Sequence, residues 1–250
     1  MSSPLVVHCK RDVYDVLVDR TTPWGNPYRI GPDFTREQAV AAYEDHLRFS
    51  PELRARLPEL RGKVLGCWCA PLPCHGEVLA RWANAPRRIL ITCSRTWRGW
   101  NRARRVLTYV YERAPDLIMV SGHARQGDRD LERIWQSLGG QVKTYEADWA
   151  AECRPDCWPP FHRKRGRDGK DYCPAAGDYR NHEMAELPGV ILCLAFLMPC
   201  EKPDCENRRA RARRLGGVHY THGARDCADY AEYEVKIPTR RFTSRMTCRG

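Results

Sequence analysis

The run Leu117-Ile118-Met119-Val120, which leads directly into Ser121-Gly122, decides the fold of the second half of this chain. Three other runs have the same form, an apolar segment that ends in small or polar residues: 88–93, 142–145 and 190–196. Runs of this length, separated by segments of helical periodicity, are typical of buried parallel strands. We therefore predict an α/β fold with a mostly parallel sheet.

The segments between these runs carry apolar residues at helical spacing. One face is predicted from Trp100, Ala103, Val106, Leu107 and Val110, and another from Leu131, Ile134, Trp135 and Leu138. A last amphipathic helix is predicted over 224–235, followed by a final strand. This alternation implies right-handed crossovers and a sheet that helices cover on both faces.

The first part of the chain has a different pattern, and we place a boundary in the sequence Asn84-Ala85-Pro86-Arg87. We predict a small α+β domain over 1–85 and the domain with the parallel sheet over 86–250, with insertions at 150–176 and 197–222. In the first domain, Thr35 is predicted to cap a helix, with Gln38 placed to complete a capping box.

Composition limits the classes of partner. The 250 residues carry a formal net charge of +11; residues 1–85 hold 11 basic and 10 acidic side chains, and the rest holds 31 and 21. A basic domain can bind nucleic acid or attract an anionic nucleotide. No run approaches the roughly 18 apolar residues of a membrane span, and the first residues do not resemble a signal peptide. We expect a cytoplasmic protein without a membrane partner.

Thirteen cysteines are unexpected in that compartment, where disulfides rarely persist. Four possible ligands lie in the first insertion, in basic and Pro-rich sequence with little apolar content: Cys153, Cys157, His162 and Cys173. Three thiolates and one imidazole would make a closed tetrahedral site, so we predict a structural zinc ion here. The alternative is a loop with spare thiols.

The second insertion holds Cys200 and Cys205, with His219 and His222 downstream. We predict a second metal site from Cys200, Cys205 and His222, or ligands shared with the first site. The spacing is looser than that of a standard zinc finger.

The first domain ends in a third group of possible ligands: Cys67, Cys69, Cys74 and His75. They could bind a metal, with a further ligand from His8 or Cys9. They could instead pack as small core residues. A third possibility is catalysis, with Cys74 as nucleophile and His75 or Glu77 as base.

Several short motifs in the second half occur in a fixed order: 94–97 (Ser-Arg-Thr-Trp), Ser121-Gly122 with Gly127-Asp128, 147–149 (Ala-Asp-Trp), 176–184 and 194–196 (Leu-Ala-Phe), then 223–238. Over most of 87–242 this half resembles the SLOG superfamily, and specifically its YspA-like branch. The resemblance implies a Rossmann-like domain that binds nucleotides or nucleotide-derived ligands, and a possible homodimer. Cys93 stands where the family usually has Gly, and the Pro-Gly-Gly-x-Gly-Thr loop and catalytic Glu of the enzymatic branch are missing from the sequence, which favours binding over catalysis.

Ligands of such sheets bind at the carboxyl ends of the strands. Gly122 and Gly127 allow close approach of the backbone, and Arg95 and Arg180 could clamp a phosphate. Asp128 could cap a helix or hold a ribose hydroxyl. The full set of predicted ligand-binding residues is Ser94, Arg95, Gly122, Gly127, Asp128, Arg180, Asn181, Gly223 and Ala224.

The first domain carries two motifs, Trp24-Gly25-Asn26-Pro27 and the Cys-rich segment 67–76. Over residues 5–83 it resembles a small uncharacterised domain family of bacteria and phages, recognised by WGNP and CWCxPxxCHG. The resemblance implies no established activity.

These observations predict binding, with processing left open, of a nucleotide-derived small molecule, in signalling or in conflict between phage and host. One alternative is a hydrolase or glycosidase that acts on a nucleotide, with Cys74, His75, Glu77 or Asp128 in catalytic roles. The other is a nucleic-acid-binding module, which would show steep salt dependence.

Overall fold

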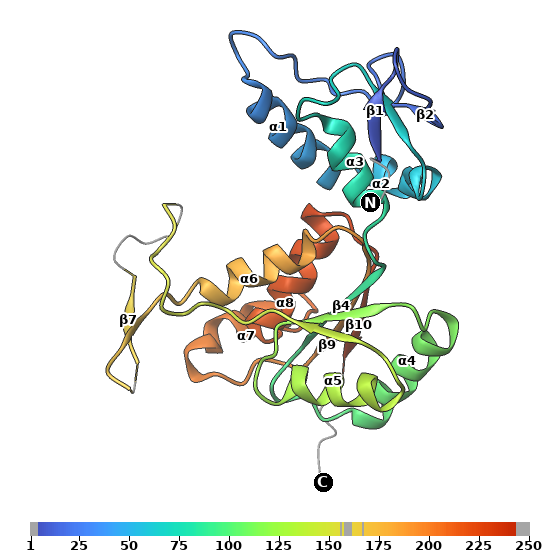
Figure 1. Ribbon diagram of the computed structural model, residues 1–250. Helices are drawn as coiled ribbons and strands as arrows, with labels where there is room; N and C mark the ends of the chain where they lie inside the picture. The colour runs from blue at the N-terminus through green and yellow to red at the C-terminus, as the bar shows by residue number, and fades with distance from the viewer. Residues whose placement is uncertain (1–4, 156, 158–161, 167, 244–250) are drawn as a thin grey trace. The chain divides into compact units, whose positions relative to one another are not determined.

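The computed structural model describes residues 5–155, 157, 162–166 and 168–243. The chain divides into two units between Pro86 and Arg87, and each is taken by itself below (Figure 1). Within the described residues, no helix has both the length and the apolar character that a membrane span requires.

The C-terminal unit contains a five-stranded sheet in the order β10-β9-β4-β5-β6, and every neighbouring pair is parallel. The strands are β4 (Arg88–Cys93), β5 (Ile118–Ser121), β6 (Val142–Thr144), β9 (Val190–Leu197) and β10 (Thr239–Thr243). All four apolar runs that the sequence analysis singled out are strands of this sheet. The predicted α/β fold with a Rossmann-like parallel sheet is therefore confirmed.

Helices cover both faces of this sheet (Figure 1). Ile89 and Met119 face a cluster formed with α4 (Trp100–Arg113) and α5 (Gly127–Ser137). Leu90 and Val120, one residue further along each strand, face α6 (Ala176–Ala185), α8 (His222–Asp229) and the π-helical turn Tyr230–Glu234. Alternate side chains of a strand point to opposite faces, so strands covered on both sides are apolar throughout. The predicted apolar faces of α4 and α5 are confirmed.

Both insertions leave the sheet at the carboxyl ends of strands. The first follows β6 and contains a two-stranded antiparallel hairpin, β7 (Lys164–Arg165) and β8 (Asp171–Tyr172). The second follows β9 and contains a 3₁₀ turn (Pro203–Cys205) and α7 (Glu206–Arg214). Because all five strands are parallel, both insertions start from the same edge of the sheet.

The N-terminal unit has a three-stranded parallel sheet in the order β1-β3-β2: β1 (Val6–His8), β3 (Leu65–Cys67) and β2 (Val16–Leu17). Its helices are α1 (Arg36–Arg48), α2 (Pro51–Arg56), a 3₁₀ turn (Leu57–Leu60) and α3 (His75–Ala83). Thr35 caps α1 and forms the predicted capping box with Gln38. Helix α3 begins at His75, with Cys74 as its N-cap.

Candidate functional site

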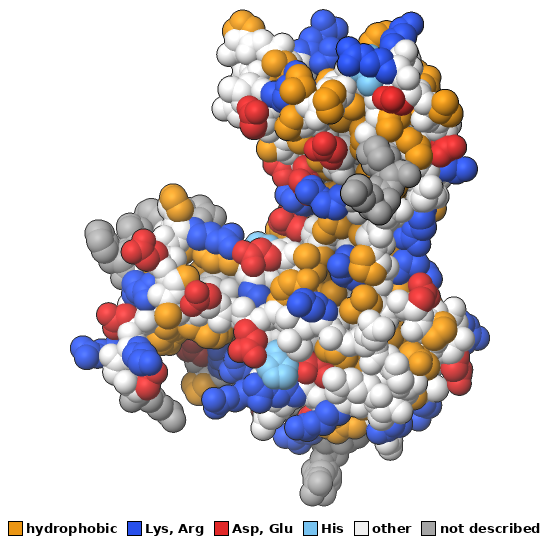
Figure 2. Space-filling view, viewed as in Figure 1, with side chains coloured by type: hydrophobic (Ala, Val, Ile, Leu, Met, Phe, Trp, Pro, Cys, Tyr) orange, Lys and Arg blue, Asp and Glu red, His pale blue; other side chains and the backbone are white. Residues whose placement is uncertain are grey.

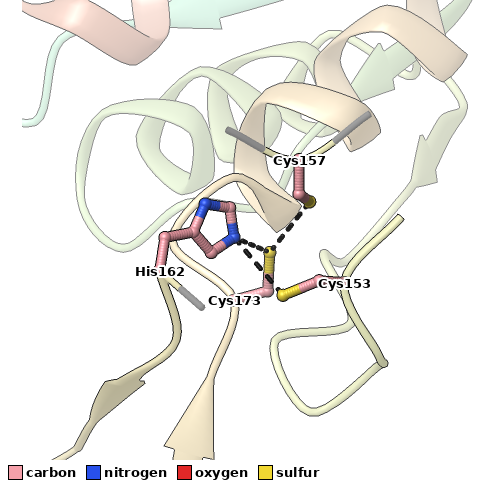
Figure 3. Close-up of side chains that lie close together, drawn as sticks. All are labelled: Cys153, Cys157, His162 and Cys173. Atoms are coloured by element: carbon pink, nitrogen blue, oxygen red, sulfur yellow. Dashed lines mark hydrogen bonds between the residues drawn. The ribbon is translucent and has the colours of Figure 1, made fainter. Parts of the chain in front are cut away.

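The first insertion gathers four side chains around one point. Their ligand atoms all lie within 4.8 Å of one another, and Figure 3 shows the side chains turned toward a common centre: Cys153, Cys157, His162 and Cys173. The Nε2 atom of His162 lies 3.1 Å from the Cys173 Sγ and 3.4 Å from the Cys153 Sγ. Three thiols and an imidazole at this spacing could hold a metal ion. We call this group the first centre.

Polar contacts place the segments that carry the first centre. The Cys173 N–H donates to the Trp149 carbonyl at 3.0 Å. Arg163 donates to the carbonyls of Ala151 and Asp171, at 2.6 and 2.9 Å. These bonds hold the two ends of the insertion together. They matter because the segment has few apolar side chains that could pack into a core. Cys173 lies three residues before α6, so the centre also fixes the start of that helix.

The second insertion gathers another four ligands, which we call the second centre: Cys200, Cys205, His219 and His222. The His222 Nε2 lies 3.3 Å from the Cys205 Sγ and 3.1 Å from the His219 Nε2. Burial lowers the pKa of both histidines, which favours the neutral imidazole that metals bind. Sequence reasoning noted His219 but did not include it among the predicted ligands. Among the described residues, these four ligands form a set separate from the first centre.

Several of the predicted ligand-binding residues bond to one another or to nearby backbone near the carboxyl ends of the strands. The Ser94 hydroxyl lies 2.5 Å from the Thr221 hydroxyl and accepts from the Met198 N–H at 2.9 Å. Asn181 donates its side-chain amide to the Gly223 carbonyl at 3.2 Å. Ala224, beside Gly223 in α8, is buried.

Asp128 is the buried acid of this region, 5% exposed. Its carboxylate accepts from the Cys93 N–H at 3.0 Å and from the Ala124 N–H at 3.2 Å. The N-cap of α5 is Gln126, so Asp128 links the ends of β4 and β5 and does not cap its own helix. Burial raises the pKa of Asp128 to about 6.

The loop after β5 packs tightly against its neighbours. A β-carbon on Gly127 would overlap the Ser94 carbonyl and the Cys93 Sγ. Two non-glycine residues in the loop have positive φ, 53° for His123 and 68° for Gln126. Such backbone is uncommon for residues with side chains and is held by surrounding contacts. Arg95, one of the two arginines predicted to clamp a phosphate, is exposed.

A buried polar network in this loop was missed by sequence reasoning. Glu132 of α5 accepts from the Ser121 hydroxyl at 2.6 Å, and its other oxygen lies 2.8 Å from the His123 Nδ1. The sequence held one indication of this network. Glu132 lies one helical turn after Asp128, so both acids share one face of α5.

A groove of about 820 Å³ lies elsewhere in this unit. It is lined by α6, α7, α8 and the π-helical turn, and we call it the helical groove. Its residues include three arginines (Arg208, Arg211 and Arg225), four acids (Asp178, Asp226, Asp229 and Glu234), and His182, His219, His222, Tyr230 and Tyr233. Among the described residues that line it, none belongs to the predicted ligand-binding set. The arginine cluster of 208–214 is basic in the sequence, and a helix over 224–235 was predicted, but the sequence does not show that these segments and α6 line one groove.

Charges and rings in the helical groove are partly paired. Arg225 lies 3.4 Å from Asp229, and the His182 Nε2 lies 3.6 Å from an Asp226 oxygen. The His182 ring stacks on Tyr230 with centroids 3.7 Å apart. Burial raises the pKa of Asp178, and the nearby Asp226 charge adds to that effect.

The N-terminal unit brings together Cys67, Cys74 and His75, whose ligand atoms lie within 4.8 Å of one another. Among the described residues near this group, Cys69, His8 and Cys9 do not belong to it. The Cys67 thiol donates to Cys74 and lowers the pKa of Cys74, as do backbone N–H groups of α3. Burial lowers the pKa of His75. The Glu77 side chain is exposed, and its N–H donates to the Cys74 carbonyl.

Comparisons with known proteins concern the N-terminal unit. A family model described as a domain of unknown function (DUF4326) matches residues 7–85. An "Uncharacterized 12.4 kDa protein in nrdA-td intergenic region" of Enterobacteria phage T4 is 40% identical over 84 residues, which cover 32% of this chain and 76% of that protein. The match agrees with the resemblance to an uncharacterised phage and bacterial family. No solved structure matches the chain.

Proposed function

This chain belongs, through its N-terminal unit, to the family of the domain of unknown function DUF4326. We propose that its C-terminal unit binds a nucleotide-derived ligand in the helical groove, with zinc in the two centres that hold its walls. The helical groove carries this proposal, because its side chains match the three parts of a nucleotide. Its volume of about 820 Å³ lies within the common range of ligand pockets, roughly 300–1,000 Å³.

The arginines of α7 supply the phosphate contacts in this proposal. Arg208 and Arg211 lie one turn apart on α7 and line the groove together with Arg225 of α8. Guanidinium groups bind phosphate oxygens through paired hydrogen bonds, so two or three of them suit a mono- or diphosphate. Asp178 and Asp226, which also line the groove, can accept from ribose hydroxyls, and the exposed ring of Tyr233 offers a surface for a base.

Zinc is the metal that we propose for both centres of the C-terminal unit. Thiolate and imidazole donors favour zinc among the common divalent ions, and four protein ligands make a closed structural site. The second centre contributes His219 and His222 to the wall of the helical groove, so a metal there fixes one wall. The first centre fixes the start of α6, which carries Asp178 and His182.

In this proposal the sheet of the C-terminal unit is a SLOG-like sheet, as the sequence resemblance implies. The proposal differs from the resemblance in the place of the ligand, because Arg180, Asn181 and Ser94 already bond to neighbouring groups. A role in conflict between phage and host is part of the same proposal.

One observation favours a second candidate, a nucleic-acid-binding module. Helix α7 carries five arginines and has no buried residue (Arg208, Arg209, Arg211, Arg213 and Arg214). Against it, Figure 2 shows Lys and Arg side chains spread over the face in view, with acidic side chains between them. A continuous basic surface is the usual footprint of a backbone-binding protein.

Calorimetric titration of the full chain with ADP tests the proposal. Compared with the unsubstituted chain, the double variant Arg208→Gln/Arg211→Gln should bind ADP at least tenfold more weakly. The double variant Arg104→Gln/Arg105→Gln should keep the affinity for ADP. The control pair lies exposed on α4, outside the groove. Equal affinity in both double variants, or no ADP binding by the unsubstituted chain, would contradict the proposal. Oligonucleotide binding with a steep salt dependence and no ADP binding would favour the second candidate.

A further inference from the structure

We propose that Cys67, Cys74 and His75 form a three-ligand metal site whose open coordination position faces a cavity in the N-terminal unit and takes a small organic anion. The inference rests on the N-terminal unit alone and is independent of what the helical groove binds.

The orientation of His75 favours ligation through one nitrogen. Its Nε2 lies 2.6 Å from the Val18 carbonyl, which can only accept, so Nε2 carries the proton. The lone pair of the neutral ring is then on Nδ1. A histidine that ligates a metal usually donates its other N–H to a carbonyl or carboxylate in this way, which fixes both ring and tautomer.

The two thiols are held in place by the turn that starts α3. Cys74 is the N-cap of the helix, in extended backbone, and both Cys67 and Cys74 are 2% exposed. Gly76 explains part of the motif. A β-carbon there would come within 2.9 Å of a Val6 methyl carbon and 3.3 Å of the Cys74 Sγ. The absence of a side chain at residue 76 therefore lets the turn that carries the ligands pack against β1.

These three ligands lie on the wall of a cavity of about 440 Å³. Both motifs of the unit contribute to it: Asn26 from the WGNP motif, and Trp68 and Cys69 from the Cys-rich motif. Closed structural zinc sites have four protein ligands, whereas sites that bind a substrate or water have three and leave one position open. The first and second centres each bring four ligands together, and this group brings three of the described residues together beside a cavity.

The cavity walls indicate the class of ligand. Arg20 and Arg36 place two guanidinium groups there. Arg20 donates to the Asn26 carbonyl, and Arg36 donates to the Pro73 carbonyl and also bonds to the Cys69 thiol. The Asp19 carboxylate accepts from Thr21 and from the Trp68 indole N–H at 3.0 Å. The wall thus has an excess of positive charge. Trp68 and Ile30, 52% and 50% exposed, supply apolar surface. A carboxylate or phosphate on a small organic molecule suits the metal and the arginines, and its apolar part suits Trp68 and Ile30.

Metal content of the full chain tests the ligand set. Native mass spectrometry should show one metal fewer in Cys67→Ser than in the unsubstituted chain. Cys69→Ser and Cys9→Ser, two neighbouring thiols outside the group, should keep it. An unchanged metal count in Cys67→Ser would overturn the site. Loss of the same metal in Cys69→Ser would show a closed four-ligand centre and would overturn the open position.

Cobalt substitution tests the open position. Azide, a small anion that binds open cobalt sites, should shift the visible cobalt bands of the unsubstituted chain. Arg36→Gln should lower the affinity for azide several-fold. Arg29→Gln should not lower it, because Arg29 is exposed and lies outside the cavity. The shift should vanish in Cys67→Ser and persist in Cys153→Ser, which alters the first centre. No azide-dependent shift, or a shift lost only in Cys153→Ser, would overturn the proposal.

Discussion

The guanidinium of Arg180 lies directly against Gly122. It donates to the Gly122 carbonyl and, at 2.8 Å, to the Tyr145 carbonyl, and its Nε donates to the Asn181 side chain. A β-carbon on residue 122 would overlap the guanidinium. An arginine predicted to clamp a phosphate thus joins the loop after β5 to the end of β6. Bonds to two carbonyls from one guanidinium stabilise the edge of the sheet from within.

Substitution of Gly122 by alanine should therefore be costly. The new methyl group must displace the Arg180 guanidinium from its two carbonyl partners, and overpacking of this kind costs about 1–3 kcal/mol. Urea denaturation of Gly122→Ala should show this loss in the free energy of unfolding. Gly223→Ala is the matched control, because a β-carbon there meets nothing within 4 Å. An equal loss in both variants would contradict the close contact at Gly122.

Loss of the metal from the first centre should disorder the first insertion and leave the rest of the unit folded. Cys173→Ser should remove one metal ion and make the insertion between β6 and α6 more sensitive to a protease, because little apolar surface otherwise orders it. Limited proteolysis with mass mapping measures this. Cys227→Ser is the control: that thiol is fully buried in the core beside Leu90, outside all three groups of possible ligands. It should keep its metal even where it lowers global stability.

His219 should matter as much as the cysteines of the second centre. Since its Nε2 lies within ligand distance of the group, His219→Ala should lower the metal content as Cys200→Ser does. His182→Ala offers the comparison, because that histidine lines the same groove but stacks on Tyr230 outside the centre. Full metal occupancy in His219→Ala would reduce the centre to the three ligands expected from sequence.

The fold could be predicted because its signals are local. An apolar run such as 117–120 must be buried on both faces, and only a covered parallel sheet does this for several runs at once. The capping box of Thr35 and Gln38 is equally local, since both bonds form within one turn. Neither inference depends on contacts between distant residues.

The candidate site could be predicted only in part, because it depends on distant contacts. The ligands of the first centre were found because they share one short segment. His219 was not included, because a β-bridge between Pro199 and Tyr220 brings it beside Cys200, and the sequence does not show that pairing. The partners of Asp128 are 35 residues away at Cys93 and 4 away at Ala124, so a helix cap and a ligand contact had the same sequence signal.

The buried carboxyl of Asp128 makes a prediction about pH. Its pKa is about 6 in the folded protein, raised by burial from an ordinary value of 3.8. Between these values the folded chain keeps a proton that the unfolded chain has released. Since the native state binds more protons there, the free energy of unfolding should fall as pH rises from 4 to 6, and the loss should then stay constant.

Asp128→Asn isolates this effect because the amide does not titrate and still has an oxygen that can accept one of the two N–H bonds. The unfolding free energy of the native chain minus that of the variant should decrease between pH 4 and 7, by at most about 3 kcal/mol at about 1.4 kcal/mol per pKa unit. Urea denaturation at closely spaced pH values gives this difference. Protonation of the metal ligands affects both proteins alike and cancels. A difference that stays constant with pH would show that Asp128 is ionised over the whole range, held by the Cys93 and Ala124 N–H groups and by Arg180 despite its burial.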